Sequence, residues 1–369
     1  MIPNTFFCPN PHCRNHNPTT PEWSTKNGTH KTKAFGVVQR YKCKECNRTF
    51  STQTFSLNYY LKIKTNFSLL FEQFNSVNSD CFIARHFRMS FDSVQLRRDR
   101  LARNALFLQT KLLEPHKIEE PVCIDGFESY TKSKYYPTNL NIIVGSKSLF
   151  IYYFTVSLQR RKGAMSPKQK NRCLIEYTGK SFSDSRLYIQ FKELLTYLEG
   201  RVRDDCIEIR TDEHRTYKQV IENEGSAVKL SILHTRTPST QPRTKKNPLF
   251  PVNYIDRLIR KDCPNHRRKT VCQAKNDRNM SSRFVTYIVS HNFFKPKHIL
   301  SRKMTEHEHH CSGFGIDTET VRYWKELFLK ARFFRSKIEL PKYFDDIWFK
   351  RIPTPLKDTA DYVPKYACA

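Results

Sequence analysis

The sequence predicts a multidomain protein in which a small metal-stabilised module and a helical segment precede a larger α/β domain. Two close pairs of cysteines lie within the first 50 residues, and residues 57–113 have helical periodicity. From residue 121 onward, short apolar runs typical of strands alternate with helical segments. A chain of 369 residues can form several domains without disulfide support. We expect them at residues 1–55, 56–115 and 116–300, followed by a helix and an extended tail at residues 301–369.

The charge of the chain indicates a polyanionic partner. Lys and Arg total 64 against 35 Asp and Glu, which gives a formal net charge of +29 and an isoelectric point near 9.7. This excess is larger than solubility requires, and nucleic acid is the polyanion that we expect. A membrane surface is disfavoured because no apolar run is long enough to span a bilayer. The start of the chain, Met1 to Asn4, lacks the features of a signal peptide, so we expect a cytoplasmic protein.

The two cysteine pairs predict a zinc ribbon. Cys8 and Cys13 form the first pair, Cys43 and Cys46 form the second, and 29 residues separate the two pairs. Four thiolates satisfy the tetrahedral preference of Zn²⁺, and a segment this short and polar needs the metal in order to fold. His12 could replace Cys13 as a ligand, but Cys13 completes the symmetric set. The other cysteines lack paired spacing and are interpreted as small apolar residues: Cys81, Cys123, Cys173, Cys206, Cys263, Cys272, Cys311 and Cys368.

The helical segment predicts a helix-turn-helix that binds DNA. A first helical stretch ends near Arg88, and Ser90 can cap a second helix. Helical periodicity turns Phe91, Val94 and Leu101 of this second helix inward. The opposite face would then enter the major groove with Gln95, Arg97, Arg98, Arg100 and Arg103. An ordinary helical hairpin with a solvated basic face is the alternative, because Arg88 stands where such turns usually have glycine.

The order of elements after residue 121 predicts a mixed sheet flanked by helices. Three strands are expected first, at residues 121–126, 140–144 and 149–156, with a basic loop after them at residues 160–172. The next element is a helix at residues 187–198, which Ser183 or Asp184 can cap. After it we expect a strand that ends at Asp212, a helix at residues 216–222, a strand at residues 228–233 and a further helix. This succession is the ribonuclease H-like arrangement, in which the first strand is central and adjoins the fourth.

Three aspartates on these elements form the predicted catalytic site. Asp125 lies near the end of the first strand, Asp212 at the carboxyl end of the fourth, and Asp256 on the helix after the loop at residues 235–248. Neighbouring strands diverge where the strand order reverses, so Asp125 and Asp212 can share a metal ion there. Three such carboxylates can hold two ions of Mg²⁺ or Mn²⁺ that activate a nucleophile and stabilise the leaving oxygen of a phosphodiester. A surface ion pair is the alternative for Asp256, and Asp262, facing elsewhere on the same helix, is a weaker candidate for the third acid.

Together these motifs resemble those of prokaryotic insertion-sequence transposases that have an acid triad (DDE or DDD) and an amino-terminal zinc ribbon. The resemblance covers most of the chain, and the order of the motifs is its most specific part. It rests on the four paired cysteines, the helix-turn-helix, Ile124-Asp125-Gly126, Arg210-Thr211-Asp212 and residues 247–260, with basic segments at residues 265–270 and 291–296 and at Arg283. Most such enzymes have Glu as the third acid. The shorter Asp256 requires its helix to lie closer to the metal.

The resemblance implies a Mg²⁺-dependent DNA transposase, a polynucleotidyl transferase. It would hydrolyse phosphodiesters at transposon ends, after which the freed 3′-hydroxyl attacks target DNA in line between two metal ions. Asp125 would bridge both ions, while Asp212 and Asp256 would each hold one. The implied partners are double-stranded DNA, as terminal repeats and as target, and further copies of the chain on that DNA in a prokaryotic nucleoid. Basic side chains would position phosphates: Arg257, Arg260, His266, Arg267 and Arg268.

Two other functions stay open at this point. A DNA-binding regulator could use the ribbon and the helix-turn-helix with an inactive catalytic domain. A structure-selective nuclease of the same fold could cut branched DNA without joining ends. Neither alternative changes the expected partner, because both act on DNA.

The carboxyl-terminal part of the chain has weaker signals. Residues 306–311 read Glu-His-Glu-His-His-Cys, but adjacent histidines cannot all face one ion, so we expect an exposed loop rather than a metal site. Trp324, Leu327 and Phe328 predict a packed terminal helix. Residues 353–369 are expected to be extended.

Overall fold

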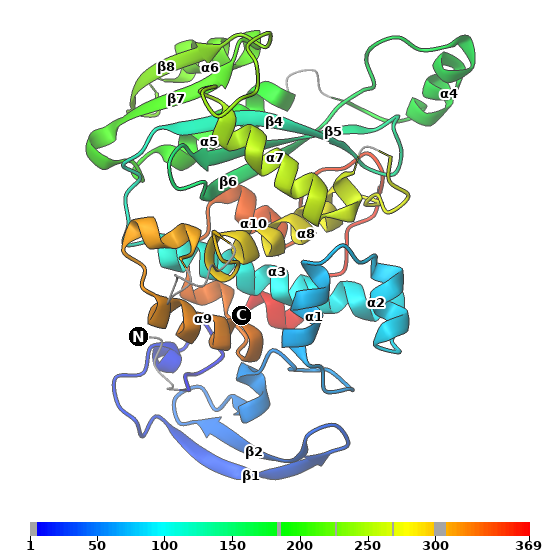
Figure 1. The fold of residues 1–369 in the computed structure, drawn as a ribbon. Helices are drawn as coiled ribbons and strands as arrows, with labels where there is room; N and C mark the ends of the chain where they lie inside the picture. Colours follow the sequence, from blue (N-terminus) through cyan, green and yellow to red (C-terminus); the bar gives the residue numbers. More distant parts are fainter. Residues whose placement is uncertain (1–5, 183–185, 226, 268, 299–307) are drawn as a thin grey trace.

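The computed structural model describes residues 6–182, 186–225, 227–267, 269–298 and 308–369. These residues form three tiers (Figure 1): a small β-sheet at one end, helices in the middle and a larger sheet at the other end. The predicted helix cap at Ser183 or Asp184 lies outside the described residues.

The first tier is a three-stranded antiparallel sheet in the order β1-β2-β3. Its strands are β1 (Ser24–Thr32), β2 (Gly36–Cys43) and β3 (Thr49–Ser51). Phe50 stacks between two other rings, with centroids 5.3 Å from Trp23 and 5.6 Å from Tyr41. These rings and the cysteines form a small cluster separate from the main core. So small an apolar cluster cannot by itself offset the entropy of ordering the ribbon.

The middle tier is built around one long helix, α3 (Phe91–Leu113). As predicted, Ser90 caps it: the Ser90 hydroxyl accepts a hydrogen bond from the Ser93 N–H at 3.2 Å. Helices from distant parts of the chain surround α3: α1 (Phe67–Phe74), α2 (Asp80–His86), α8 (Asp277–Val289), α9 (Thr318–Lys330) and α10 (Lys342–Trp348). Contacts with α2, α8, α9 and α10 bury α3 along most of its length.

The prediction that the basic face of α3 points into solvent is wrong. Arg97, Arg98, Arg100 and Arg103 are all buried. Three of them donate hydrogen bonds to buried acceptors: Arg97 to the Thr65 hydroxyl at 2.7 Å, Arg100 to the Leu57 carbonyl at 3.0 Å and Arg103 to the Trp348 carbonyl at 3.1 Å. The acceptors lie outside α3 in the sequence, so its local pattern could not reveal them. Phe91, predicted to point inward, is exposed.

An ion network fastens α2 to α3 and α8. Asp80 forms salt bridges with Arg98 of α3 and with Arg283 of α8, the latter at 2.6 Å, and accepts a hydrogen bond from Gln95. Arg98 is only 1% exposed. Burial by itself would raise the pKa of Asp80, but the two guanidinium groups outweigh it and hold the pKa below its usual value. Gln95, predicted to contact DNA, is therefore part of a structural network.

The large sheet is mixed and has the order β6-β5-β4-β7-β8. Its strands are β4 (Val122–Tyr130), β5 (Pro137–Gly145), β6 (Ile151–Leu158), β7 (Cys206–Asp212) and β8 (Ser231–Thr237). The first three pair antiparallel, whereas β4, β7 and β8 run parallel. β4 is central and adjoins β7, as the sequence predicts. Helices α5 (Arg186–Leu198) and α8 both pack on β6, whose residues are all buried.

Several predicted boundaries are corrected by the structure. The predicted basic loop contains α4 (Pro167–Tyr177), which a capping box formed by Ser166 and Gln169 begins. The last strand starts at Ser231 rather than residue 228, because its residues pair with β7 from Cys206 onward. The helix predicted at residues 216–222 is the slightly longer α6 (Arg215–Glu224). The tail predicted to be extended ends in a 3₁₀ turn, Lys365–Cys368.

The Asp80 network makes a prediction about stability. Asp80→Ala leaves Arg98 and Arg283 buried without their counter-ion, so the free energy of unfolding should fall by about 3–5 kcal/mol. Urea unfolding of the zinc-loaded protein measures the change. Glu326→Ala, which removes the partner of Lys330 in an exposed pair, is the control and should have little effect. An equally small effect of Asp80→Ala would contradict a structural role for the network.

Candidate functional site

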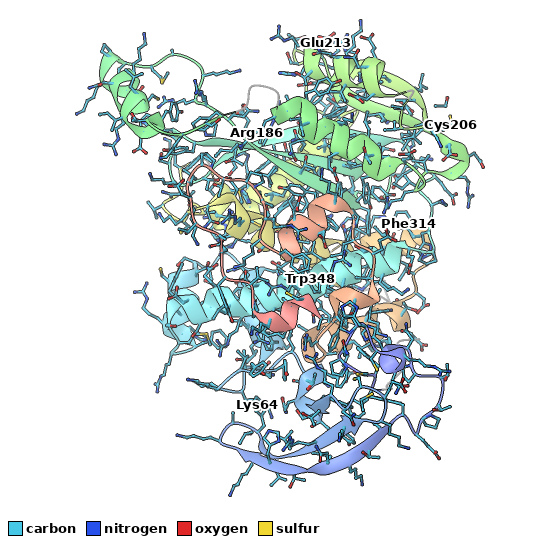
Figure 2. The ribbon with its side chains drawn as sticks, turned by 180° about the vertical axis from the view of Figure 1, so that it is seen from behind. Lys64, Arg186, Cys206, Glu213, Phe314 and Trp348 are labelled. Carbon is cyan, nitrogen blue, oxygen red and sulfur yellow. The ribbon has the colours of Figure 1, made fainter. Side chains whose placement is uncertain are left out.

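The sheet places two of the three predicted acids side by side. Val122 of β4 pairs with Ile209 of β7, and the next residues pair in the same register. Continued by three positions, this register sets Asp125 level with Asp212. Both carboxylates lie where β4 and β7 stop pairing, and β7 ends at Asp212. Figure 2 shows Glu213, the residue after Asp212, at the end of β7 opposite to Cys206.

The third acid comes from α7 (Phe250–Asp262), a helix that packs against β4 and β5. Its apolar face, with Val252, Ile255 and Ile259, is buried against the sheet. Asp256 follows Ile255 at the edge of this face and is partly buried rather than solvated. The Asp125 carboxylate raises the pKa of Asp256, whereas Arg260 and Arg243 lower it, so these three groups lie near Asp256. The helix therefore brings its acid to the sheet.

The acids repel one another in a partly desolvated site. Burial raises the pKa of Asp125 from its usual value to about 6, and the Asp212 carboxylate adds to the rise. Burial and the neighbouring Asp125 raise the pKa of Asp256 well above its usual value. Arg243 lowers the pKa of Asp125, and Arg260 followed by Arg243 lowers that of Asp256, but these cations do not cancel the rise. A site that penalises carboxylate charge in this way is one that a cation would stabilise.

The polar atoms of the cluster fit divalent metal ions. Asp125 Oδ1 accepts a hydrogen bond from the Gly126 N–H at 2.7 Å, and Asp212 Oδ1 accepts one from the His214 N–H at 2.9 Å. Asp256 Oδ1 is buried and has no hydrogen-bond partner among the residues that the structure describes, although buried polar atoms are normally satisfied. Oxygen ligands of this kind suit Mg²⁺ or Mn²⁺.

The three carboxylates are not all within 4.8 Å of one another, because among the described residues only the four paired cysteines form such a group. Asp125 is the member that interacts electrostatically with both of the others, which makes it the central one.

Two residues that the sequence did not indicate complete the cluster. Arg243, on an exposed segment after β8, interacts electrostatically with Asp125 and Asp256. Tyr217 of α6 is buried, and burial together with all three acids raises the pKa of Tyr217 well above its usual value. The phenol therefore keeps its proton. An arginine in a short basic stretch of a loop and a tyrosine on an amphipathic helix have no distinctive spacing, so only the fold identifies them.

Gly126 leaves room for the side chain of Asn139 on β5. A Cβ at this position would lie 2.3 Å from Asn139 Nδ2, so any other residue here would make the Asn139 amide move.

The predicted phosphate-contacting residues have mixed outcomes. Arg257 and Arg267 are exposed. Arg260 is partly buried, donates hydrogen bonds to the carbonyls of His266 and Glu128, and lies 4.4 Å from the ring of Phe127. Arg268 lies outside the described residues.

The expectation that His266 contacts phosphates is not met, because its ring is buried. Its Nδ1 lies 2.9 Å from the Ser129 hydroxyl, and Phe127 packs against the ring edge. Burial lowers the pKa of His266 to about 3, so the ring is neutral. Asp262, the weaker candidate for the third acid, forms a 2.6 Å salt bridge with Lys295 and takes no part in the acid cluster.

A second candidate metal site lies in the ribbon and consists of the four predicted cysteines. Cys8 Sγ lies 3.4 Å from Cys46 Sγ, and Cys13 Sγ lies 3.7 Å from Cys43 Sγ. Four thiols with all sulfurs within 4.8 Å fit tetrahedral Zn²⁺. His12 is exposed and is not a member of the group.

The surroundings of the sulfurs favour a thiolate. Burial opposes ionisation of Cys43, but hydrogen bonds from the Asn15 side chain and from the N–H groups of Cys46 and Glu45 outweigh it and lower the pKa to about 7. Burial raises the pKa of Cys8. A metal ion resolves this conflict because it binds all four sulfurs as thiolates. Of the remaining cysteines, Cys81, Cys206 and Cys368 are exposed, so their interpretation as buried apolar residues is wrong.

The histidine-rich segment is not the exposed loop that the sequence suggested. His310 and Cys311 are buried, and the His310 ring stacks on His291 with centroids 4.1 Å apart. His310 Nδ1 lies 2.8 Å from the Ser148 carbonyl oxygen. Burial lowers the pKa of both rings, that of His291 to about 3, so both are neutral packing groups. Residues 306–307 lie outside the described part of the chain.

Neither the protein-family models nor the curated proteins compared with the chain give a match. None of the helices in the described ranges combines the length and the apolar character needed to cross a bilayer.

Zinc binding by the ribbon is directly testable. Cys43→Ser should reduce bound zinc from about one ion per chain to a small fraction of that, and should change the fluorescence of Trp23, which packs beside the cysteine cluster. Zinc released into a colorimetric chelator after denaturation provides the count. Cys206→Ser, at an exposed cysteine outside the cluster, is the control. Full zinc content in the Cys43 variant would exclude this site.

The acid cluster predicts a distinctive dependence of stability on pH. An unfolded Asp ionises near pH 4, whereas Asp125 keeps its proton up to about pH 6. The folded state therefore binds more protons in this window, and for zinc-loaded protein without Mg²⁺ or Mn²⁺ its stability should fall as pH rises from about 4 to about 6. Asp125→Asn removes that loss, so near pH 7 without added Mg²⁺ it should be more stable than wild type, by on the order of 1–3 kcal/mol.

Adding Mg²⁺ should make wild type more stable than Asp125→Asn. The ion relieves the repulsion between the carboxylates of wild type and so raises its thermal midpoint, whereas it binds the amide variant only weakly and stabilises it little. Thermal melts of both proteins across pH, with and without Mg²⁺, measure the difference. A wild-type thermal midpoint that changes neither with pH in this window nor with added Mg²⁺ would contradict the proposed cluster.

Proposed function

We propose that the protein is a metal-dependent polynucleotidyl transferase with a ribonuclease H-like catalytic domain that cuts DNA and joins the freed ends, as transposases do. The observation that carries this proposal is the convergence of Asp125, Asp212 and Asp256 from β4, β7 and α7. A central strand, its parallel neighbour and a covering helix supply one carboxylate each. The net charge of +29 supports DNA as the substrate.

Asp125, Asp212 and Asp256 would hold two Mg²⁺ ions. Bound there, the ions would supply an activated attacking oxygen and stabilise the leaving one. Asp125 would bridge them because it is the central acid. Asp256 has a shorter side chain than the Glu usual in such enzymes, and the direct packing of α7 on β4 supports its use here.

The surrounding residues have separate tasks in this proposal. Arg243 would bind the phosphate that flanks the scissile bond, because its charge lies next to the acids on an exposed segment. Tyr217 would orient the cluster as a buried hydrogen-bond donor. Arg257 and Arg267, both exposed, are further candidates for backbone contacts. Double-stranded DNA would serve both as transposon end and as target, with several copies of the chain assembled on it.

Loss of any one acid should abolish catalysis and leave DNA binding intact. Each of Asp125→Asn, Asp212→Asn and Asp256→Asn should lower Mg²⁺-dependent nicking by more than about 100-fold, since removing a ligand exceeds the effect of an outer-shell change. The substrate is a supercoiled plasmid carrying the genomic DNA that flanks the coding sequence. Gel analysis follows nicking and strand joining separately.

The control for this experiment is Asp262→Asn on the same helix, which should keep wild-type activity because Asp262 pairs with Lys295. Nicking without joining by wild type would favour a structure-selective nuclease. DNA binding without any Mg²⁺-dependent cutting would favour a regulator. Retained cutting by the Asp256 variant would remove it from the triad.

A further inference from the structure

The β1–β2 hairpin is strongly basic and largely exposed. Residues 24–43 contain five Lys or Arg and no acid. The five are Lys26, Lys31, Lys33, Arg40 and Lys42. All but Arg40 are exposed, and within the described residues none of them forms a salt bridge. Figure 2 shows side chains extending outward along the hairpin, at the opposite end of the molecule from the large sheet.

The outer half of the hairpin is a ribbon of only two strands. β3 pairs with β2 only from Arg40 to Lys42, near the zinc site. Beyond that point Thr29–Thr32 pairs with residues 36–39 and has no further neighbouring strand. Paired strands lie about 5 Å apart, so such a ribbon fits a major groove about 12 Å wide.

The two faces of this outer half differ. The register places Thr29 opposite Gln39 and Lys31 opposite Val37, which puts these four side chains on one face. Val37 is 68% exposed, whereas Val38, on the other face, is 3% exposed. Lysines can protect an edge strand from aggregation, but that role does not account for an exposed valine. The open face offers a hydroxyl, an ammonium and an apolar group, which are suited to the base edges of a major groove.

The base of the hairpin is held rigidly. Cys43 ends β2, so the candidate zinc site fixes this strand directly. The tip of the hairpin is also fixed, because Gly36 has φ +67° in the turn and the Thr32 hydroxyl accepts a hydrogen bond from the Phe35 N–H at 3.0 Å. A ribbon that is fixed at both ends loses less entropy when it binds.

We infer that the β1–β2 hairpin enters the major groove of duplex DNA, with Thr29, Lys31 and Val37 facing the base edges and Lys26 and Lys33 contacting phosphates. This inference rests on the proposed DNA partner and deepens it, because it assigns sequence recognition to the hairpin. α3, the helix expected to share that role with the ribbon, is covered by the carboxyl-terminal helices and uses its arginines internally.

Salt dependence tests the phosphate contacts. The probe is a mixed-sequence duplex of about three helical turns, with affinity for zinc-loaded, full-length protein measured by fluorescence anisotropy. The double variant Lys26→Ala, Lys33→Ala should flatten the slope of log affinity against log salt by about 2. Its affinity at about 0.15 M salt should fall by roughly 10- to 100-fold.

The matched control removes the same charge elsewhere. Lys111→Ala, Lys330→Ala takes away two exposed lysines that pair with glutamates outside the hairpin. Its salt slope should stay close to that of wild type. An equal flattening of the salt slope in both variants would mean that net charge alone determines the salt dependence of binding, and would overturn the inference.

Sequence selection tests entry into the groove. Duplexes selected from a random library by wild type should show interference when guanine N7, in the major groove, is methylated. Val37→Asp should remove a preferred base position from the selected sequences. Interference confined to adenine N3 in the minor groove, or an unchanged preference in the Val37 variant, would overturn the inference.

The two proposals fail in different ways. A hairpin-dependent salt slope without any Mg²⁺-dependent cutting by wild type would contradict the enzyme and leave the hairpin as a DNA-binding element. Mg²⁺-dependent cutting by a hairpin variant that keeps wild-type affinity and salt slope would contradict the hairpin inference alone.

Discussion

Asp125, Asp212 and Asp256 place three carboxylates together where β4 and β7 of the large sheet stop pairing. Such like charges repel strongly where water is partly excluded. The fold holds this arrangement by independent means. β4 and β7 pair in a fixed register, while α7 is held against the sheet by its buried apolar face. The buried Asp256 Oδ1 has no partner within the described protein. Divalent cations would both satisfy that atom and remove the repulsion, so the stability of the cluster and its proposed chemistry depend on the same ions.

The middle tier connects this site to the ribbon and explains why α3 is basic. Its arginines bind carbonyl groups and Asp80, which locks helices from both halves of the chain together. Guanidinium groups are well suited to this because each can donate several hydrogen bonds in a fixed plane. Exposed positive charge lies instead on other surfaces, such as the β1–β2 hairpin and the loop with Arg243.

The sequence predicted those features that depend on local patterns. The four cysteines could be identified from spacing, and the central strand, its parallel neighbour and the acid-bearing helix from the order of apolar runs. Features that depend on distant contacts could not be identified in this way. The acceptors of Arg103 and the salt-bridge partner Arg283 lie far from α3 in the chain, so the basic pattern of that helix looked solvated. Arg243 and Tyr217 join the acid cluster only through the fold, and His310 is buried because it stacks on a histidine from another element.

The central claim is that the three aspartates bind a pair of divalent ions. Anomalous scattering from crystals soaked in Mn²⁺ tests it most directly. The account predicts two manganese peaks about 3.5–4 Å apart, one between Asp125 and Asp212 and one between Asp125 and Asp256. Manganese bound elsewhere, with Asp256 turned away from the other two acids, would contradict it.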